Sequence, residues 1–80
     1  MKIHKYIGRY NISGKNIKVA RERCKLSQEQ LAAKLQLAGL SLTQKAISRI
    51  ETGERVVADF ELQYFAAVLG VKITWLLSTD

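Results

Sequence analysis

The chain has 80 residues, of which 48% are hydrophobic, with five glycines and no proline; this is enough for one small, mainly helical domain but not for two cores. A single cysteine and a single histidine exclude an internal disulfide and a structural zinc site. No carboxylate pair or Ser/His/Asp set points to an enzyme, so we expect no catalysis, no cofactor and no metal.

Charge is unevenly distributed along the chain. Residues 1–25 hold eight of the thirteen basic side chains but only one of the seven acidic ones. Such a basic end favours attraction to a polyanion. No apolar stretch approaches the roughly 20 residues that cross a bilayer, and the N-terminus lacks the apolar core of a signal peptide. These features predict a soluble, cytoplasmic protein with no membrane contact.

The first twelve residues show neither a helical nor a strand period, so we interpret 1–12 as a basic N-terminal arm and 13–80 as the domain. A first helix is expected over residues 14–25, with Ser13 as its N-cap. Its inward face follows the spacing i, i+3, i+4, i+7: Ile17, Ala20, Arg21 and Cys24. Cys24 is thus expected to be buried. Arg21 needs a partner, because an unpaired buried charge is very costly.

Residues 28–38 carry the clearest local helix signal. Ser27 followed by Gln30 predicts a capping box, and Leu26 with Leu31 fits the two positions of a hydrophobic staple. Gly39 is a natural residue for the end of this helix. The expected inward face consists of Leu31, Leu35 and Ala38.

A third helix is expected between Thr43, its N-cap, and Gly53, which ends it. The helical period turns one set of side chains inward: Ala46, Ile47 and Ile50. The opposite side carries amide, hydroxyl and cationic groups: Gln44, Lys45, Ser48, Arg49 and Thr52.

The fourth helix is expected from its N-cap Asp59 through Leu69, with an apolar stripe made of Leu62, Phe65, Ala66 and Leu69. A short fifth helix is expected over residues 72–78. Trp75 within it has two interpretations: it fills the core beneath this helix, or it anchors an interface.

Two adjacent helices with a glycine in the link, the second having a polar outer face, meet the requirements of a helix-turn-helix. The major groove of B-DNA is about 12 Å wide and admits one helix. Gln44 could pair with adenine, and Lys45 or Arg49 with guanine. Thr43 and Ser48 are short enough for phosphate or thymine-methyl contacts. From the residues alone, an ordinary solvated helix face remains the alternative.

Four segments carry a family resemblance: LSQEQLA at 26–32, AISRIETGER at 46–55, LGV at 69–71 and WLL at 75–77. In this order and on these helices they resemble the phage-repressor and Cro-like helix-turn-helix family (the xenobiotic-response-element type). The similarity covers residues 14–78. It implies an all-α, lambda-repressor-like bundle and a sequence-specific regulator of transcription, a repressor, that binds double-stranded DNA.

The resemblance also implies roles for individual residues. Arg21 would form a structural ion pair with Glu51, which supplies the partner that the buried arginine needs. The groups facing DNA bases would be Thr43, Gln44, Lys45, Ser48 and Arg49. Those approaching phosphate would be Gln28, Thr52, the backbone at Gly53, and Arg55. Family members commonly dimerise through the C-terminal end, so a homodimer on a palindromic operator is expected.

The sequence departs from the family in two places. The stretch from Ala32 to Glu51 is longer than usual by roughly one helical turn, which leaves the angle between the second and third helices open. The loop after Gly53 lacks the frequent proline and begins with the acidic Glu54. The arm could follow a minor groove or phosphate backbone, or it could be a disordered tail, residues 1–5 above all.

A second class of function is a protein-interaction module on the same fold, such as an antitoxin or anti-repressor partner. An interface with a protein alone would need more exposed aromatic or aliphatic anchors than the Gln44/Lys45/Arg49 face offers. The residues therefore favour DNA as the partner.

Overall fold

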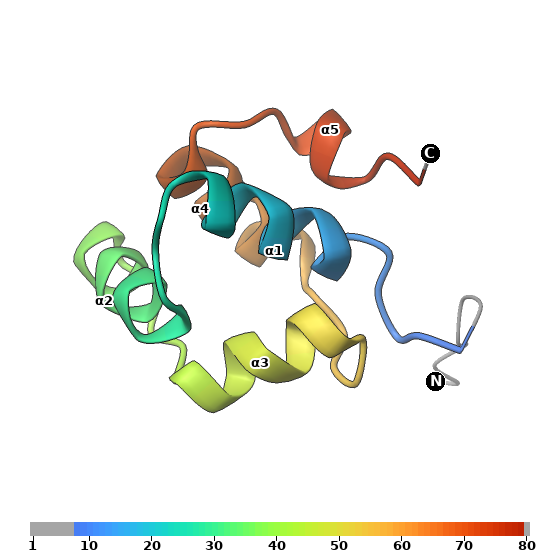
Figure 1. Ribbon diagram of the computed structural model, residues 1–80, viewed down its shortest axis with the longest axis horizontal. Coiled ribbons are helices and arrows are strands. Elements are labelled where there is room, and N and C mark those ends of the chain that lie inside the picture. Colours follow the sequence, from blue (N-terminus) through green and yellow to red (C-terminus); the bar gives the residue numbers. More distant parts are fainter. Residues whose placement is uncertain (1–7, 80) are drawn as a thin grey trace.

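The computed structural model describes residues 8–79, which form an all-α bundle, as the sequence predicts. In chain order the helices are α1 (Gly14–Arg23), α2 (Gln28–Ala38), α3 (Gln44–Thr52), α4 (Asp59–Leu69) and α5 (Ile73–Leu76). Helices α1 and α2 both pack on α3, while α4 packs on α1, α2 and α5. Figure 1 shows α3 along one side of the bundle and α5 on the opposite side. Within the described residues, no helix is long and apolar enough to cross a membrane.

The core is built from the apolar stripes that the helical period predicts. Phe65 is fully buried, and the other three residues of the α4 stripe are buried with it. Opposite them lie Ile17 of α1, Leu31 and Leu35 of α2, and Ile47 and Ile50 of α3, all fully buried. Because every helix contributes to one cluster, burial of these side chains fixes how the helices face each other.

Helices α2 and α3 begin and end at the predicted residues. Ser27 and Gln30 form the capping box: the Ser27 hydroxyl accepts from the Gln30 N–H at 3.0 Å, and the Gln30 amide oxygen accepts from the Ser27 N–H at 2.8 Å. Gly39 ends α2 with φ 112°, a left-handed conformation that a glycine adopts at no steric cost. Thr43 caps α3 by accepting the Ala46 N–H at 3.0 Å. One detail was wrong: Ala38 is exposed.

Helix α1 begins at Gly14 with Ser13 in the N-cap position, as predicted, but its capping hydrogen bond and its C-terminal end differ from the prediction. The Ser13 side chain makes no capping hydrogen bond; instead Asn11 accepts the Gly14 N–H through Oδ1 at 2.8 Å. The helix ends at Arg23, because Lys25 adopts a left-handed conformation with φ 58°. Cys24 therefore lies just past the helix and is exposed, contrary to the prediction, with its thiol 3.7 Å from the carbonyl of Leu69.

The starts of α4 and α5 also differ. The N-cap of α4 is Ala58, and Asp59 is the first helical residue. The Ala58 N–H donates to the Glu61 carboxylate at 2.9 Å, so Glu61, the third residue of the helix, satisfies the N–H of the N-cap residue. Helix α5 spans four residues, fewer than predicted. Trp75 is partly buried against the core, with the Arg23 guanidinium 5.5 Å from its ring centroid.

Candidate nucleic-acid interface

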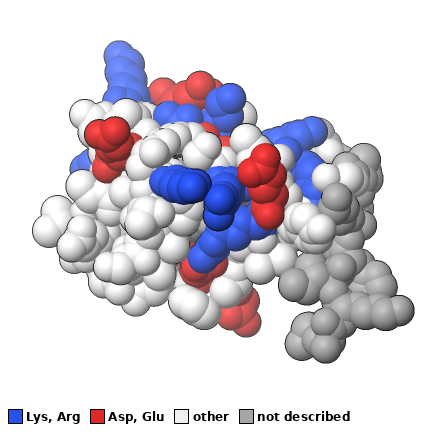
Figure 2. Space-filling model, turned by 90° about the horizontal axis from the view of Figure 1, so that it is seen from below, with Lys and Arg blue, Asp and Glu red and all other residues white. Residues whose placement is uncertain are grey.

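Helix α3 presents an exposed polar face on one side of the bundle. Gln44, Lys45, Arg49 and Thr52 are exposed, and Ser48 is partly exposed. Seen from this side, Lys and Arg side chains gather in the middle of the face, with Asp and Glu side chains around them (Figure 2). The only acidic residue of α3, Glu51, is buried. The outer face of the helix is therefore free of negative charge.

Two cationic side chains of α3 have no partner within the described residues. Within the described residues, Lys45 and Arg49 form no ion pair and their side chains donate no hydrogen bond. By contrast, Arg21 and Arg55 are each paired with a glutamate, and Arg9 donates to backbone carbonyls. The charges of Lys45 and Arg49 are thus available to an external anion.

Arg21 and Glu51 form the ion pair that joins α1 to α3. Arg21 Nε lies 2.7 Å from Glu51 Oε2, and Nη2 lies 3.0 Å from Oε1. The two side chains are 11% and 2% exposed. The hydrogen bond with Glu51, and the charge of that carboxylate, raise the pKa of Arg21 despite its burial. The pair keeps the acidic group of α3 inside the protein and neutralised.

The carboxylate of Glu51 is also the start of a short hydrogen-bonded chain. Gln28 donates its Nε2 to Glu51 Oε1 at 3.0 Å, and its own Oε1 accepts from Gln44 Nε2 at 2.6 Å. Within the described residues, Gln44 Oε1 has no protein partner. This series of hydrogen bonds therefore holds the Gln44 amide group in one orientation at the start of α3. Its Oε1 acceptor and one of its N–H donors remain available to an external partner.

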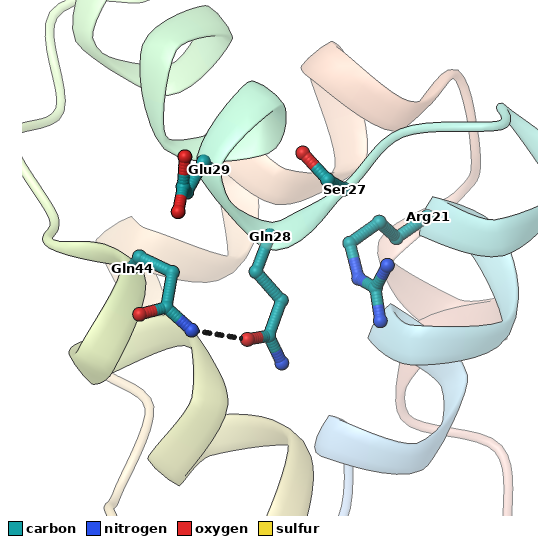
Figure 3. A pocket seen from close by; sticks show the side chains of 5 residues that line it. All are labelled: Arg21, Ser27, Gln28, Glu29 and Gln44. Atoms are coloured by element: carbon teal, nitrogen blue, oxygen red, sulfur yellow. Dashed lines mark hydrogen bonds between the residues drawn. The ribbon is translucent and has the colours of Figure 1, made fainter.

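These side chains line an open hollow of about 460 Å³ between α2 and α3 (Figure 3). Its walls are formed by Arg21, Ser27, Gln28, Glu29 and Gln44. In Figure 3 the Gln28 and Gln44 amide groups point toward each other across it. The hollow is polar and shallow, so it suits contact with a larger polar surface better than enclosure of a small molecule.

The three hydroxyl groups on this face differ in the hydrogen bonds that they form within the protein. The Thr43 hydroxyl oxygen accepts the capping N–H, which leaves its proton free to donate. Thr52 donates its hydroxyl to the Arg49 carbonyl at 3.2 Å. The Ser48 side chain has no partner within the described part of the chain. Thr43 and Ser48 can therefore donate outward without breaking a bond.

Gly53 and Arg55, for which phosphate contacts were predicted, are engaged within the protein. The Gly53 N–H donates to the carbonyls of the last turn of α3, and the residue is buried. Arg55 forms a two-pronged pair with Glu61, at 3.0 Å for both contacts. A phosphate contact at either residue would require these bonds to be exchanged.

The Arg55–Glu61 pair shifts both groups toward their charged forms. Burial alone would raise the pKa of Glu61, but the hydrogen bonds from Arg55 and the Ala58 N–H, with the charge of Arg55, hold that pKa below its ordinary value. The hydrogen bond with Glu61 also raises the pKa of Arg55. This pair joins the loop after α3 to the start of α4.

Sequence reasoning missed Asn11, Arg9 and Glu61. Asn11 is buried, and its side chain forms three hydrogen bonds: it accepts from the N–H of Gly14, the first residue of α1, and donates to the carbonyls of Ile50 and Arg55. The only signal was an asparagine shortly before a helix, a residue type that caps helices. Residues 1–7 of the predicted arm lie outside the described residues.

The comparisons with known proteins agree with this geometry. The sequence model of a helix-turn-helix family matches residues 17–76, which cover all five helices except the first turn of α1. No curated protein and no solved structure matches the chain. With a match over most of its length, the chain belongs to the Cro/C1-type helix-turn-helix family and is a DNA-binding regulator of that type.

Proposed function

We propose that this protein is a sequence-specific repressor that inserts α3 into the major groove of an operator. The observation that supports this most directly is the distribution of charge on α3. Its one acid, Glu51, is buried and paired with Arg21, whereas Lys45 and Arg49 are exposed and unpaired within the described chain. A solvated face with no ligand would not require the acid to be turned inward.

Base recognition would rest on Gln44 and Arg49, with Lys45 beside them. The free Oε1 and the remaining N–H of Gln44 match the N6 donor and N7 acceptor of adenine. Arg49 can donate to O6 and N7 of guanine with its planar guanidinium, and Lys45 can reach one of these acceptors. Thr43 and Ser48 would contact phosphate or a thymine methyl group at the edge of the helix.

Phosphate contacts would lie at the ends of the two helices. The first N–H groups of α2, at Gln28, have no partner within a helix and carry the positive end of its dipole. Thr52 lies exposed at the far end of α3, where rotation of its hydroxyl away from the Arg49 carbonyl would let it donate to a phosphate. Such contacts set the position on DNA, while the groups on α3 select the sequence.

One copy of the domain offers one recognition helix and so covers one half-site. A homodimer would place two such helices roughly 34 Å apart on one face of a palindromic operator. Binding across a promoter would then repress transcription by excluding the polymerase. The oligomeric state with and without operator DNA, measured by analytical ultracentrifugation, tests this part of the proposal; a monomer under both conditions contradicts it.

The central experiment is selection of DNA from a randomised duplex library with the purified chain, followed by affinity measurements on the selected duplex. Gln44→Ala and Arg49→Ala should each weaken specific binding by about 1–3 kcal/mol. Lys72→Ala is the matched control, because Lys72 is an exposed cation at the N-cap of α5, and α5 lies on the side of the bundle opposite α3 (Figure 1). No enriched sequence, or equal effects of all three substitutions, would contradict the proposal.

A further inference from the structure

Three consecutive residues ahead of α1, Arg9, Tyr10 and Asn11, bind the C-terminal end of α3; we call them the N-terminal strap. The Tyr10 N–H donates to the Gly53 carbonyl at 2.8 Å. Arg9 donates from Nη2 to the Glu51 carbonyl at 2.9 Å. The last carbonyls of a helix have no partner inside it, and a cation is favourable at this negative end of the helix dipole. The strap therefore satisfies the end of α3.

Asn11 is the most tightly held part of the N-terminal strap. It is 7% exposed, and its Nδ2 donates to the carbonyls of Ile50 at 2.9 Å and Arg55 at 2.7 Å. Its Oδ1 accepts the Gly14 N–H. One side chain thus links the start of α1, the last turn of α3 and the loop that follows. The donors and the acceptor of its side chain are all used in these bonds.

The fit of the parts around the strap is close. A Cβ atom at Gly14 would collide with the Ile50 carbonyl, and one at Gly53 would lie 2.8 Å from the Arg9 side chain. In Figure 1 the chain ahead of α1 runs down beside the bundle to the end of α3. The C-terminal end of α3 therefore has little room to move while the strap is in place.

Two other contacts also hold α3. The Gln28–Gln44 hydrogen bond holds its first residue, and the Arg21–Glu51 pair holds the inward side of its last turn through a side chain, whereas the strap holds the backbone carbonyls of that turn. Arg49, which we propose reads a base, lies in the last turn, where the strap acts. Recognition groups must be held within about 0.5 Å and 10–20° to discriminate between partners. A change of tilt at this end would displace Arg49 first.

We propose that the N-terminal strap determines the base selectivity of α3 by fixing the tilt of its C-terminal half, without itself touching bases. This inference rests on the proposed function, and Arg9 and Asn11 are positioning residues in it. They precede the segment that matches the helix-turn-helix family, residues 17–76. The strap thus makes the selectivity of this protein depend on residues outside the matched domain.

The test is the discrimination ratio of the full chain, defined as Kd for a scrambled duplex divided by Kd for the duplex selected with the wild type. Asn11→Asp is nearly isosteric and keeps the acceptor for Gly14, but it loses both donors to α3 and the loop. It should lower the ratio about tenfold or more, through weaker specific binding. Arg9→Ala should also lower the ratio, and Arg9→Lys, which keeps a cation and a donor, should restore part of it.

A control variant distinguishes an effect of the strap on base selectivity from an effect on stability alone. Ile73→Ala removes apolar contact on α5, which lies on the side of the bundle opposite α3 (Figure 1), and should lower the melting temperature while leaving the ratio unchanged. All variants are compared at a temperature where circular dichroism shows them folded. If Asn11→Asp does not fold, the discrimination ratios of Arg9→Ala and Arg9→Lys test the proposal.

The outcomes separate the two proposals. Folded Arg9→Ala and Asn11→Asp variants with the wild-type ratio would overturn the role of the strap and leave the proposed function intact. A wild-type chain that binds the scrambled and selected duplexes equally would overturn the proposed function itself.

Discussion

Arg21 on α1 and Glu51 on α3 share two hydrogen bonds, of 2.7 and 3.0 Å, in a site where the carboxylate side chain is 2% exposed. The third nitrogen of Arg21 donates to the Leu26 carbonyl at 2.8 Å. The same pair thus fixes the turn between α1 and α2 and the position of α3. Gln28 bonds to the same carboxylate and Gln44 bonds to Gln28, so a structural ion pair supports the surface that we propose reads DNA.

Replacing Arg21 with alanine should strongly destabilise the fold. The substitution leaves the Glu51 carboxylate buried without its cation, and loss of one partner of a buried pair costs about 3–5 kcal/mol. Urea unfolding at neutral pH measures the change. Lys18→Ala, at an exposed position of the same helix, is the control and should change the free energy of unfolding by less than about 0.5 kcal/mol. Similar small effects of both substitutions would contradict the assigned role of the pair.

Replacing Gln28 with alanine should weaken DNA selectivity through Gln44. The change removes the acceptor that holds Gln44 Nε2, so the Gln44 amide group must be ordered anew when DNA binds. In a double-mutant cycle, Gln28→Ala and Gln44→Ala should have less than additive effects on the specific Kd. Gln36→Ala, at an exposed position on α2, should have no effect. Strict additivity of the first two substitutions would argue against the coupling.

The Arg55–Glu61 pair should make stability depend on acid pH. The pKa of Glu61 is lowered from its ordinary value of 4.5 by its hydrogen bonds and by Arg55. The unfolded chain therefore binds the proton more readily, and the stabilisation is present above about pH 4.5 and lost as pH falls through the lower, folded-state pKa.

Melting temperatures of the wild type and Glu61→Gln between pH 7 and pH 3 test this sign. The wild type should be the more stable protein at pH 7, and the difference should shrink below about pH 4.5. Glu54→Gln, which alters an exposed carboxylate of the neighbouring loop, should show no such convergence. A gap between wild type and Glu61→Gln that stays constant over the range would contradict the prediction.

Two leucines of α2 should respond very differently to the same substitution. Leu35 is 0% exposed, and Leu37, two residues later, is 89% exposed. Leu35→Ala should cost about 2–5 kcal/mol, because it removes buried surface and leaves a cavity. Leu37→Ala should fall within about 0.5 kcal/mol of the wild type. Chemical denaturation of both variants measures this, and equal losses would place α2 in a different rotation about its axis.

Helix boundaries were predictable where local chemistry decides them. Helix α2 begins at the Ser27–Gln30 capping box and ends at Gly39, as expected. Helix α3 begins after Thr43 and ends at Gly53, also as expected. These signals work because the groups that satisfy a helix end lie within a few residues of it. The α4 stripe was equally clear, since its four apolar side chains recur with the helical period.

Predictions failed in the details of capping and at the end of α1. Ser13 is the N-cap residue of α1 as expected, but the capping hydrogen bond comes from Asn11, whose side chain also bonds to the distant carbonyls of Ile50 and Arg55. Cys24 was expected to be buried by extending the helical period, but α1 had already ended at Arg23. Asp59 was expected to be the N-cap of α4, but Ala58 holds that position, and its N–H donates to Glu61, which is paired with Arg55.

The sequence by itself determined the five helices, most of the buried side of α1 to α4, and the polar outer face of α3, because these follow from periodicity and from capping within a few residues. It also placed Arg21 with Glu51 through the family resemblance. Only the tertiary structure decided which cations have no partner within the described residues. Arg9 and Arg55 carry the same charge as Arg49, but their backbone and carboxylate partners are 42 and 6 residues away along the chain. Packing in space, which local pattern does not encode, brings these groups together.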